Sequence, residues 1–373
     1  EVITAKSIIE RIDEEFPEWE TFISATTNTG FSVAERNFSN KNVFYFPLDL
    51  SWITEKVILK KRPSFILLIE LEVWPNFLIS AFKKNIPVIV VNGRISNKSV
   101  KAYRAISCIS KDFRNSLINE KNVFCARTEL DAQRFRDLGI PGKQIFVTGT
   151  MKYDNIPANI DKKISKGMAG LFHINDDDLV LIGGSTHAGE EDILIRVFER
   201  LSKTCPNLKL ILAPRHIERT RDVSRLIEKM GFVPVLKTEI ERSRYKWQDT
   251  KKTIILIDTV GDLGTIYSLS NYVFVGKSLV PSGGQNMMEP AGLGKPVIFG
   301  PHTFNFKEEA DLLLKNDAAK VVETEDELLE TIEFCIRNPD EAKEMGLKAQ
   351  KVVNEKRGAT DRNIEIIRNI IKN

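Results

Sequence analysis

The sequence predicts an α/β fold with two doubly wound domains, each built on a mostly parallel sheet. Short apolar runs alternate with helix-like patterns along nearly the whole chain, and this alternation breaks once, over residues 155–178. Alternating strands and helices give parallel sheets whose faces the helices cover. The length of 373 residues suits two domains of ordinary size. Because such domains bind ligands outside the carboxyl ends of their strands, we expect them to face a cleft.

The first half contains six strand-like runs. The chain opens in a helical pattern, in which Ile8, Ile9 and Ile12 recur near a period of 3.6 residues. An α/β domain normally opens with a strand. We therefore expect that this is a fragment whose upstream sequence, including the first strand of this domain and any membrane anchor, is missing. Strands are expected at 21–26, 43–46, 65–69, 88–91, 122–126 and 144–147, with helices such as 74–84 and 129–138 between them.

The second half repeats the pattern after a linker or domain crossing, which Asn and Pro at 155–157 and the Asp run at 176–178 favour. We assign residues 1–157 to the first domain and 158–350 to the second. Residues 351–373 then form a C-terminal helix that is able to pack back on the first domain. Strands are expected at 179–182, 208–212, 233–236, 254–257, 273–275, 297–299 and 319–322, and helices at 326–337, 340–356 and 360–372.

The amino-acid composition excludes several classes of protein. A hydrophobic content of 42% and a charged content of 28% describe a soluble globular protein. The net charge of +3 is too small to indicate nucleic-acid binding. The four cysteines and four histidines are scattered without the spacing of a zinc site, so we expect no metal, cofactor or disulfide framework. No apolar run approaches the roughly 18 residues of a membrane span.

The most informative segment lies between two strand-like runs, 271–276 and 296–299. Gly283 and Gly284 form a turn there, and a short helix-compatible stretch follows. We expect this turn to present bare backbone N–H groups to an anion at a helix N-terminus. Glu289 follows inside the helix, within reach of a ribose hydroxyl. The segment therefore predicts a nucleotide-sugar site.

A second candidate pocket lies at residues 185–191, which follow Gly183 and Gly184 at the end of a strand. Hydroxyl groups, a glycine pair and a helix start at a strand end are able to bind a phosphate or a sugar. The alternative is helix capping, with Ser185 or Thr186 as the N-cap and the acidic pair in the first turn. The sequence leaves both open.

Pro214, Arg215 and His216 follow the strand-like run 208–212. The guanidinium of an arginine is suited to a phosphate, and ligands bind at strand ends. The alternative is a surface arginine at a helix start. Residues 258–262 also follow a strand, and we interpret them as a capped turn with a weaker prospect of touching a ligand.

Glu70 and Glu72 end a buried strand of the first half and share a face while the chain is extended. Carboxylates are costly to bury without a role, although one of these could instead cap the helix that Pro75 helps to start. Residues 92–104 are basic and rich in hydroxyl groups. They fit either a solvated helix face or a site for an anionic acceptor at a membrane surface.

Taken together, these segments resemble the 3-deoxy-D-manno-octulosonic acid (Kdo) transferases of lipopolysaccharide synthesis. Those enzymes have two Rossmann-like domains of the glycosyltransferase B (GT-B) type. The order of the motifs along the chain, rather than any one motif, makes the resemblance specific. The matching segments are residues 26–30, 70–78, 92–99, 148–154, 185–191, 214–219, 258–263, 276–279, 283–290 and 300–306.

The chain departs from the family pattern in three places. Gln285 replaces the usual histidine, so the side chain still hydrogen-bonds but cannot titrate. Residues 92–94 read Asn-Gly-Arg instead of Asn-Ala-Arg. The family's catalytic glutamate stands just before the first helix in a Ser-x-Gly-Glu motif, and Glu1 takes its place here by spacing.

The resemblance implies an inverting, metal-independent enzyme that transfers Kdo from CMP-Kdo to the lipid A precursor (lipid IVA). It further implies an anionic inner-membrane surface as a partner, at the cytoplasmic face, and no nucleic acid. Glu1 would be the general base and Arg215 would stabilise the leaving phosphate. The alternatives are a GT-B enzyme that uses a UDP-sugar and a non-catalytic nucleotide-sugar-binding module. The donor side would comprise Ser185, Thr186, His187, Glu190, Pro214, Arg215, His216, Gly283, Gly284, Gln285, Asn286 and Glu289, and the acceptor side Glu70, Glu72, Arg94 and Ser96.

Overall fold

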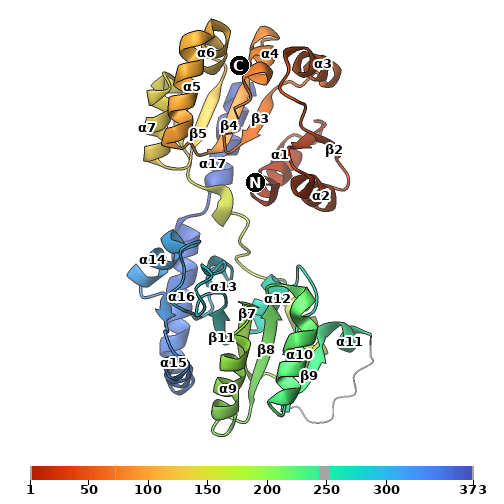
Figure 1. The fold of residues 1–373 in the computed structure, drawn as a ribbon, viewed down its shortest axis with the longest axis vertical. Helices are drawn as coiled ribbons and strands as arrows, with labels where there is room; N and C mark the ends of the chain where they lie inside the picture. Colours follow the sequence, from red (N-terminus) through yellow and green to blue (C-terminus); the bar gives the residue numbers. More distant parts are fainter. Residues whose placement is uncertain (1, 72, 243–251, 372–373) are drawn as a thin grey trace. The chain divides into compact units, whose positions relative to one another are not determined.

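The computed structural model describes residues 2–71, 73–242 and 252–371. The chain divides into two compact units: Glu1–Asn155 with Lys356–Asn373 form unit 1, and Ile156–Glu355 form unit 2. Both units have parallel strands with helices beside them (Figure 1). Unit 1 therefore contains both ends of the chain.

Unit 1 contains a four-stranded parallel sheet in the order β3-β4-β5-β6 and a separate parallel pair, β1-β2. β4 is buried along all six of its residues, as expected for a run of Val, Ile and Val in the middle of a parallel sheet. The elements are α1 (Val2–Glu15), β1 (Phe22–Ala25), α2 (Asn28–Asn37), β2 (Asn42–Tyr45), α3 (Ser51–Lys61), β3 (Ile66–Ile69), α4 (Pro75–Lys83), β4 (Val88–Gly93), α5 (Asn97–Ile109), α6 (Lys111–Leu117), β5 (Val123–Ala126), α7 (Glu129–Asp137), η1 (Gly142–Gln144), β6 (Ile145–Val147), η2 (Met151–Tyr153) and α17 (Ala359–Ile371).

Helices cover both faces of the four-stranded sheet. Ile8 of α1 and Ile367 of α17 are fully buried in one cluster with Ile89 of β4. The next residue of β4, Val90, points to the other face and packs in a cluster with Phe135 of α7. The C-terminal helix is thus part of the core of unit 1.

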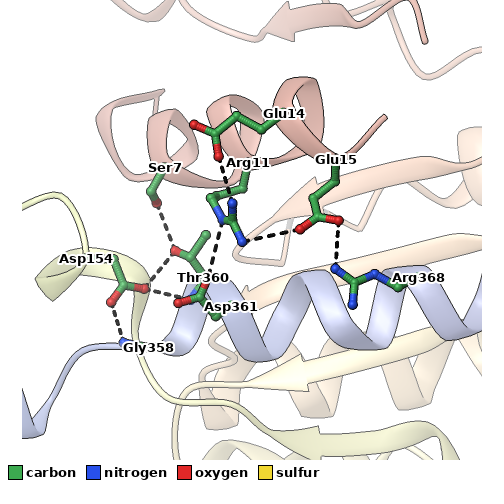
Figure 2. Close-up of polar contacts among 9 residues, drawn as sticks. All are labelled: Ser7, Arg11, Glu14, Glu15, Asp154, Gly358, Thr360, Asp361 and Arg368. Atoms are coloured by element: carbon green, nitrogen blue, oxygen red, sulfur yellow. Dashed lines mark hydrogen bonds and ion pairs between the residues drawn. The ribbon is translucent and has the colours of Figure 1, made fainter. Parts of the chain in front are cut away.

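Polar contacts also join α1 to α17. Figure 2 shows Arg11 donating to Glu14, Glu15 and Asp361, with distances of 2.7, 3.4 and 3.2 Å. Arg368 of α17 donates to Glu15 at 2.7 Å. These side chains are largely exposed, so they add little to the stability that the apolar seam provides.

Unit 2 is built on a seven-stranded parallel sheet in the order β13-β12-β11-β7-β8-β10-β9. β7 is central, between β11 and β8, so the loops that follow these three strands emerge side by side at one edge. The elements are α8 (Lys162–Leu171), β7 (Leu179–Thr186), α9 (Glu191–Ser202), β8 (Leu208–Pro214), η3 (Ile217–Arg219), α10 (Thr220–Lys229), β9 (Val233–Leu236), α11 (Lys237–Glu241), β10 (Thr253–Leu256), α12 (Leu263–Leu269), β11 (Tyr272–Val275), α13 (Met288–Gly292), β12 (Val297–Phe299), α14 (Lys307–Lys315), β13 (Ala319–Val321), α15 (Glu325–Arg337) and α16 (Pro339–Glu355).

Two expectations about local structure need correction. The stretch 155–178 is not only a linker, because it contains α8; Gly167 and Gly170 weaken the helical signal there, and no residue of α8 is buried. The helix after Gly283 and Gly284 begins only at Met288 and is five residues long. Within the described part of the chain, no helix is long and apolar enough to cross a membrane.

Candidate functional site

The predicted donor residues lie on neighbouring loops of unit 2. Ser185 and Thr186 are the last residues of β7, Arg215 follows β8, and Glu289 lies in the segment after β11. Since these strands are adjacent in the sheet, their ends meet at one edge. Ser185 has a left-handed backbone conformation (φ 54°), and the pairing of β7 with β8 shifts register at this point. Strained backbone of this kind gathers at binding sites.

Glycines allow the strand ends to approach one another closely. A Cβ added to Gly276 would lie 2.5 Å from Cα of Thr186, and one added to Gly300 would lie 2.3 Å from the carbonyl oxygen of Ser278. Both contacts are with backbone, so no side chain fits between β7, β11 and β12 here. A ligand at this edge would therefore meet bare backbone.

Arg215 and Glu289 form the charged part of the edge. Arg215 is exposed, and its backbone N–H donates to the Thr186 carbonyl at 3.0 Å. Burial raises the pKa of Glu289, and this shift is opposed by a hydrogen bond from Asn286 (2.9 Å) and by the charge of Arg215. Tyr267, fully buried beside them, has a raised pKa because of burial and of the Glu289 charge. Sequence reasoning missed Tyr267, which sits in an ordinary helical pattern.

The turn at Gly283 and Gly284 differs from the prediction. Both residues have positive φ (95° and 78°), so glycine is required there. However, the N–H of Gly284 donates to the Lys277 carbonyl at 2.6 Å and is not free for an anion. The predicted helix N-terminus is also absent at this point, because α13 starts four residues after Gly284. Asn286 and Glu289 bond to each other, while Gln285 is half-buried.

The loop after β7 resolves the question of capping. Neither Ser185 nor Thr186 caps a helix, since β7 runs to Thr186 and α9 starts at Glu191. Glu190 occupies the N-cap position and is fully buried, with its carboxylate accepting from the backbone N–H groups of four residues. A carboxylate enclosed in this way does not reach a ligand, so its predicted direct contact with the donor is wrong.

The remaining predicted donor residues surround this edge. His187 is half-buried, and its backbone N–H is one of the donors to Glu190 (2.8 Å). Pro214 is buried as the last residue of β8, and His216 after it is exposed. The Thr186 hydroxyl is buried and has no hydrogen-bond partner among the described residues.

The turn at 258–262 is held by its own side chains. Asp258 accepts from the backbone N–H of Thr238 at 3.1 Å and from its hydroxyl. Asp262 accepts from Thr259 at 2.5 Å and pairs with buried Lys237 at 3.1 Å. Both carboxylates are thus committed to structure. Among the residues that the structure describes, no group of three or more His, Cys, Asp or Glu is arranged to hold a metal ion.

The predicted acceptor residues that the structure describes follow β3 and β4 in unit 1. Glu70 is half-buried with φ 60°, and Arg94 is exposed one residue after β4. Ser96 caps α5 by accepting from the Ser99 N–H at 3.1 Å, which is the bland role for a serine at that place. Glu1 and Glu72 fall outside the described residues.

The cap of α4 comes from an unexpected residue. Asp49 accepts from the N–H groups of Asn76 (3.1 Å) and Phe77 (2.8 Å) at the start of this helix. Capping was one of two roles considered for the glutamates at 70 and 72. The partners are 27 and 28 residues apart, so no local signal indicates Asp49.

Comparison with known proteins bears on the family. A family model described as 3-deoxy-D-manno-octulosonic-acid transferase (kdotransferase) matches residues 1–155. The chain is 30% identical over 371 residues to the 3-deoxy-D-manno-octulosonic acid transferase of Haemophilus influenzae, covering 99% of this chain and 84% of the relative. It is also 30% identical over 310 residues to the protein of the same name from Aquifex aeolicus, covering 81% and 75%.

Solved structures bear on the fold. A UDP-GlcNAc 2-epimerase from Neisseria meningitidis bound to UDP-GlcNAc has a TM-score of 0.59, with 14% identity, over 100% of this chain and 97% of that one. A glycosyltransferase from Rickettsia africae has a TM-score of 0.56, with 16% identity, over 99% and 95%. These likenesses confirm the predicted GT-B fold with two Rossmann-like domains. The sequence likenesses go further: the chain belongs to the family of 3-deoxy-D-manno-octulosonic acid transferases.

Proposed function

We propose that this glycosyltransferase transfers Kdo from CMP-Kdo to the lipid A precursor lipid IVA, with inversion and without a metal ion. The names of the relatives support Kdo transfer. The observation that carries the donor assignment is the exposed Arg215 beside the half-buried Glu289 at the strand ends of unit 2. This pair offers a cation for the phosphate of CMP and a carboxylate for ribose hydroxyl groups.

In the proposed reaction, a hydroxyl oxygen of the acceptor attacks the anomeric carbon of Kdo. The bond between that carbon and the phosphate oxygen breaks, and CMP leaves with the electron pair. Glu1 takes the proton of the attacking hydroxyl as general base. Arg215 stabilises the charge that develops on the departing phosphate, which is the task a metal performs in other enzymes.

The acceptor side is proposed to include Glu70, Glu72 and Arg94. Lipid IVA is a membrane lipid, so we propose that the protein works at the cytoplasmic face of the inner membrane. The exposed guanidinium of Arg94 suits the phosphate groups of such an acceptor.

The test is transfer of Kdo from CMP-Kdo to lipid IVA by the wild type and two variants. Arg215→Ala should lower turnover by about 10²–10³-fold, the usual cost of removing a group that stabilises developing charge. Glu1→Gln should lower it at least about 10²-fold while CMP still binds. EDTA should leave the wild-type rate unchanged. Loss of activity in EDTA that magnesium restores would overturn the metal-free mechanism, and near-normal turnover of Glu1→Gln would remove Glu1 from it.

Calorimetry with CMP and UDP separates this proposal from its alternatives. We expect CMP to bind more tightly than UDP. Tighter binding of UDP would favour a UDP-sugar enzyme on the same fold. Binding of CMP without any transfer to lipid IVA would favour a non-catalytic module.

A further inference from the structure

Two consecutive glutamates follow the central strand of unit 2, and both are buried. The exposed fraction is 0% for Glu190 and 1% for Glu191. Burying adjacent carboxylates is costly unless both are well paired. Each carboxylate bonds to a different neighbouring loop: Glu190 accepts from the loop after β11, in addition to one N–H of its own loop, and Glu191 pairs with the segment after β8.

Glu190 acts as an internal anion for the loop after β11. One carboxylate oxygen accepts from the N–H groups of Ser278 (2.8 Å) and Leu279 (3.0 Å). The other accepts from Lys277 (2.6 Å) and His187 (2.8 Å). Lys277 has a left-handed backbone (φ 61°), which lets consecutive N–H groups converge on one carboxylate. This loop leads directly to the segment that carries Glu289.

Glu191 holds the segment after β8 through Arg219. The two guanidinium nitrogens of Arg219 donate to the two carboxylate oxygens at 2.7 and 3.2 Å, a bidentate pair in which the arginine side chain is 24% exposed. The backbone N–H of Arg215 bonds to Thr186 at 3.0 Å. The segment that carries Arg215 is therefore fixed at one end by β7 and at the other by Glu191.

We propose that Glu190 and Glu191 are positioning residues of the donor site, which set the Arg215 segment and the loop leading to Glu289 in register with each other. Neither touches the donor. Glu191 acts through Arg219 on the cation that meets the phosphate, whereas Glu190 acts through the loop after β11. This inference rests on the proposed function, because it concerns the site that would bind CMP.

The experiment compares CMP with cytidine, which lacks the phosphate, by calorimetry on the whole chain. Arg219→Gln should weaken CMP binding about 10-fold and leave cytidine binding within about twofold, since only the phosphate meets Arg215. In an Arg215→Ala background, adding Arg219→Gln should change CMP affinity by less than about twofold. Glu190→Gln should weaken CMP binding in both backgrounds by the same factor, because it acts through the other loop.

Arg196→Gln is the matched control. Arg196 lies on α9, as Glu191 does, and pairs with Glu325 of α15 at 2.7 Å instead of with the segment after β8. Its loss should lower stability without changing the affinity ratio of CMP to cytidine. If Arg219→Gln does not fold, Arg219→Lys replaces it, because lysine keeps the charge but loses the bidentate geometry.

The outcomes distinguish a failure of the proposed function from a failure of the positioning role of Glu190 and Glu191. Wild-type chain that is folded but does not bind CMP would overturn the proposed function, and the inference with it. If the wild type binds CMP but Arg219→Gln weakens CMP and cytidine equally, or has the same effect with and without Arg215, the pair is only structural and the inference alone fails.

Discussion

At the scale of single residues, burial has changed the acidity of two side chains of unit 2. It raises the pKa of Glu289 and lowers the pKa of Lys295 to about 8. The ammonium group of Lys295 donates to the carbonyl oxygens of Ser268 (2.8 Å) and Ser270 (2.7 Å). These carbonyls lie at the end of α12, where a helix leaves acceptors without partners. The lysine therefore ties the end of α12 to the segment that precedes β12.

Lys295 should make stability rise with pH in the alkaline range. Its pKa is about 8 in the folded state and about 10.5 in the unfolded state. Below pH 8 both states hold the proton, so the contribution is constant; between pH 8 and about 10.5 only the unfolded state holds it, which favours folding as pH rises. The free energy of unfolding of wild type minus that of Lys295→Met should climb by at most about 1.4 kcal/mol per pH unit there. Urea unfolding at several pH values measures this difference, and a flat difference would contradict it.

Sequence reasoning identified the groups at the donor edge but not the connections among them. Arg215 and Glu289 were identified because charged residues at strand ends carry a local signal. The buried role of Glu190 was missed, since its partners at 277–279 lie 87 to 89 residues away. The engagement of the Gly284 N–H by the Lys277 carbonyl was also missed, although Lys277 is close in the sequence. A motif shows which polar groups are present, whereas the structure shows which of them already hydrogen-bond to other parts of the protein.

At the scale of elements, strands were predicted best. The runs at β9 and β12 match the structure residue for residue, because they are short, apolar and rich in β-branched residues. α8 was missed because its two glycines and its exposed surface hide the helical period. α13 was placed too early, since the glycine pair was interpreted as its start. In both places the local signal is weak and tertiary contacts decide.

The start of α17 provides a prediction about one such contact. The carboxylate of Asp154 accepts from the N–H of Gly358 and from the N–H and hydroxyl of Thr360, each at 2.7 Å (Figure 2). Asp154 lies at the end of the first stretch of unit 1 and thus caps the helix of its second stretch. Asp154→Ala should lower the free energy of unfolding by about 1–2 kcal/mol, as the loss of a helix cap does. Thermal or urea unfolding provides the measurement.

Asp361→Asn is the control for the Asp154 variant. Asp361 lies on the same helix, is 71% exposed, and pairs with Arg11 at 3.2 Å. An exposed pair of this kind contributes between about 0 and 1 kcal/mol. If both variants lower the free energy of unfolding by the same amount, the Asp154 cap does not stabilise the protein more than an exposed ion pair does.

At the scale of the whole molecule, the two units divide the proposed work. Donor candidates lie in Ile156–Glu355, while Glu70 and Arg94 lie in unit 1. We predict that a fragment of residues 156–355 binds CMP weakly. It should end no earlier than Glu355, because Val352 and Val353 of α16 are buried in unit 2. Calorimetry on this fragment, with circular dichroism to verify folding, tests the prediction. Binding of CMP by unit 1 alone would contradict it.

A basic surface of unit 1 leads to the last prediction. It comprises α5, α6 and the residues that flank them. Its acidic residues are Asp112, which pairs with Lys83 at 3.8 Å, and the exposed Glu120. Ile109 at the end of α5 is 88% exposed. An exposed apolar side chain among cations suits an anionic lipid surface, although a plain solvated face remains the alternative. The exposed cations of this surface are Arg94, Lys98, Lys101, Arg104, Lys111, Arg114 and Lys121.

We predict that the chain binds anionic vesicles weakly and reversibly, and less as salt rises. Each cation near an anionic leaflet contributes about 1 kcal/mol at most, and salt screens it. Replacing Lys98, Lys101 and Arg104 by Gln should remove most of the binding in a sedimentation assay at low salt. Replacing Lys162, Lys163 and Lys166 of α8, which are also lysines on a helix, should not. If the first triple variant still binds, or the wild type does not bind at all, this surface does not face the membrane, and the proposed lipid acceptor would have to reach the protein by another face.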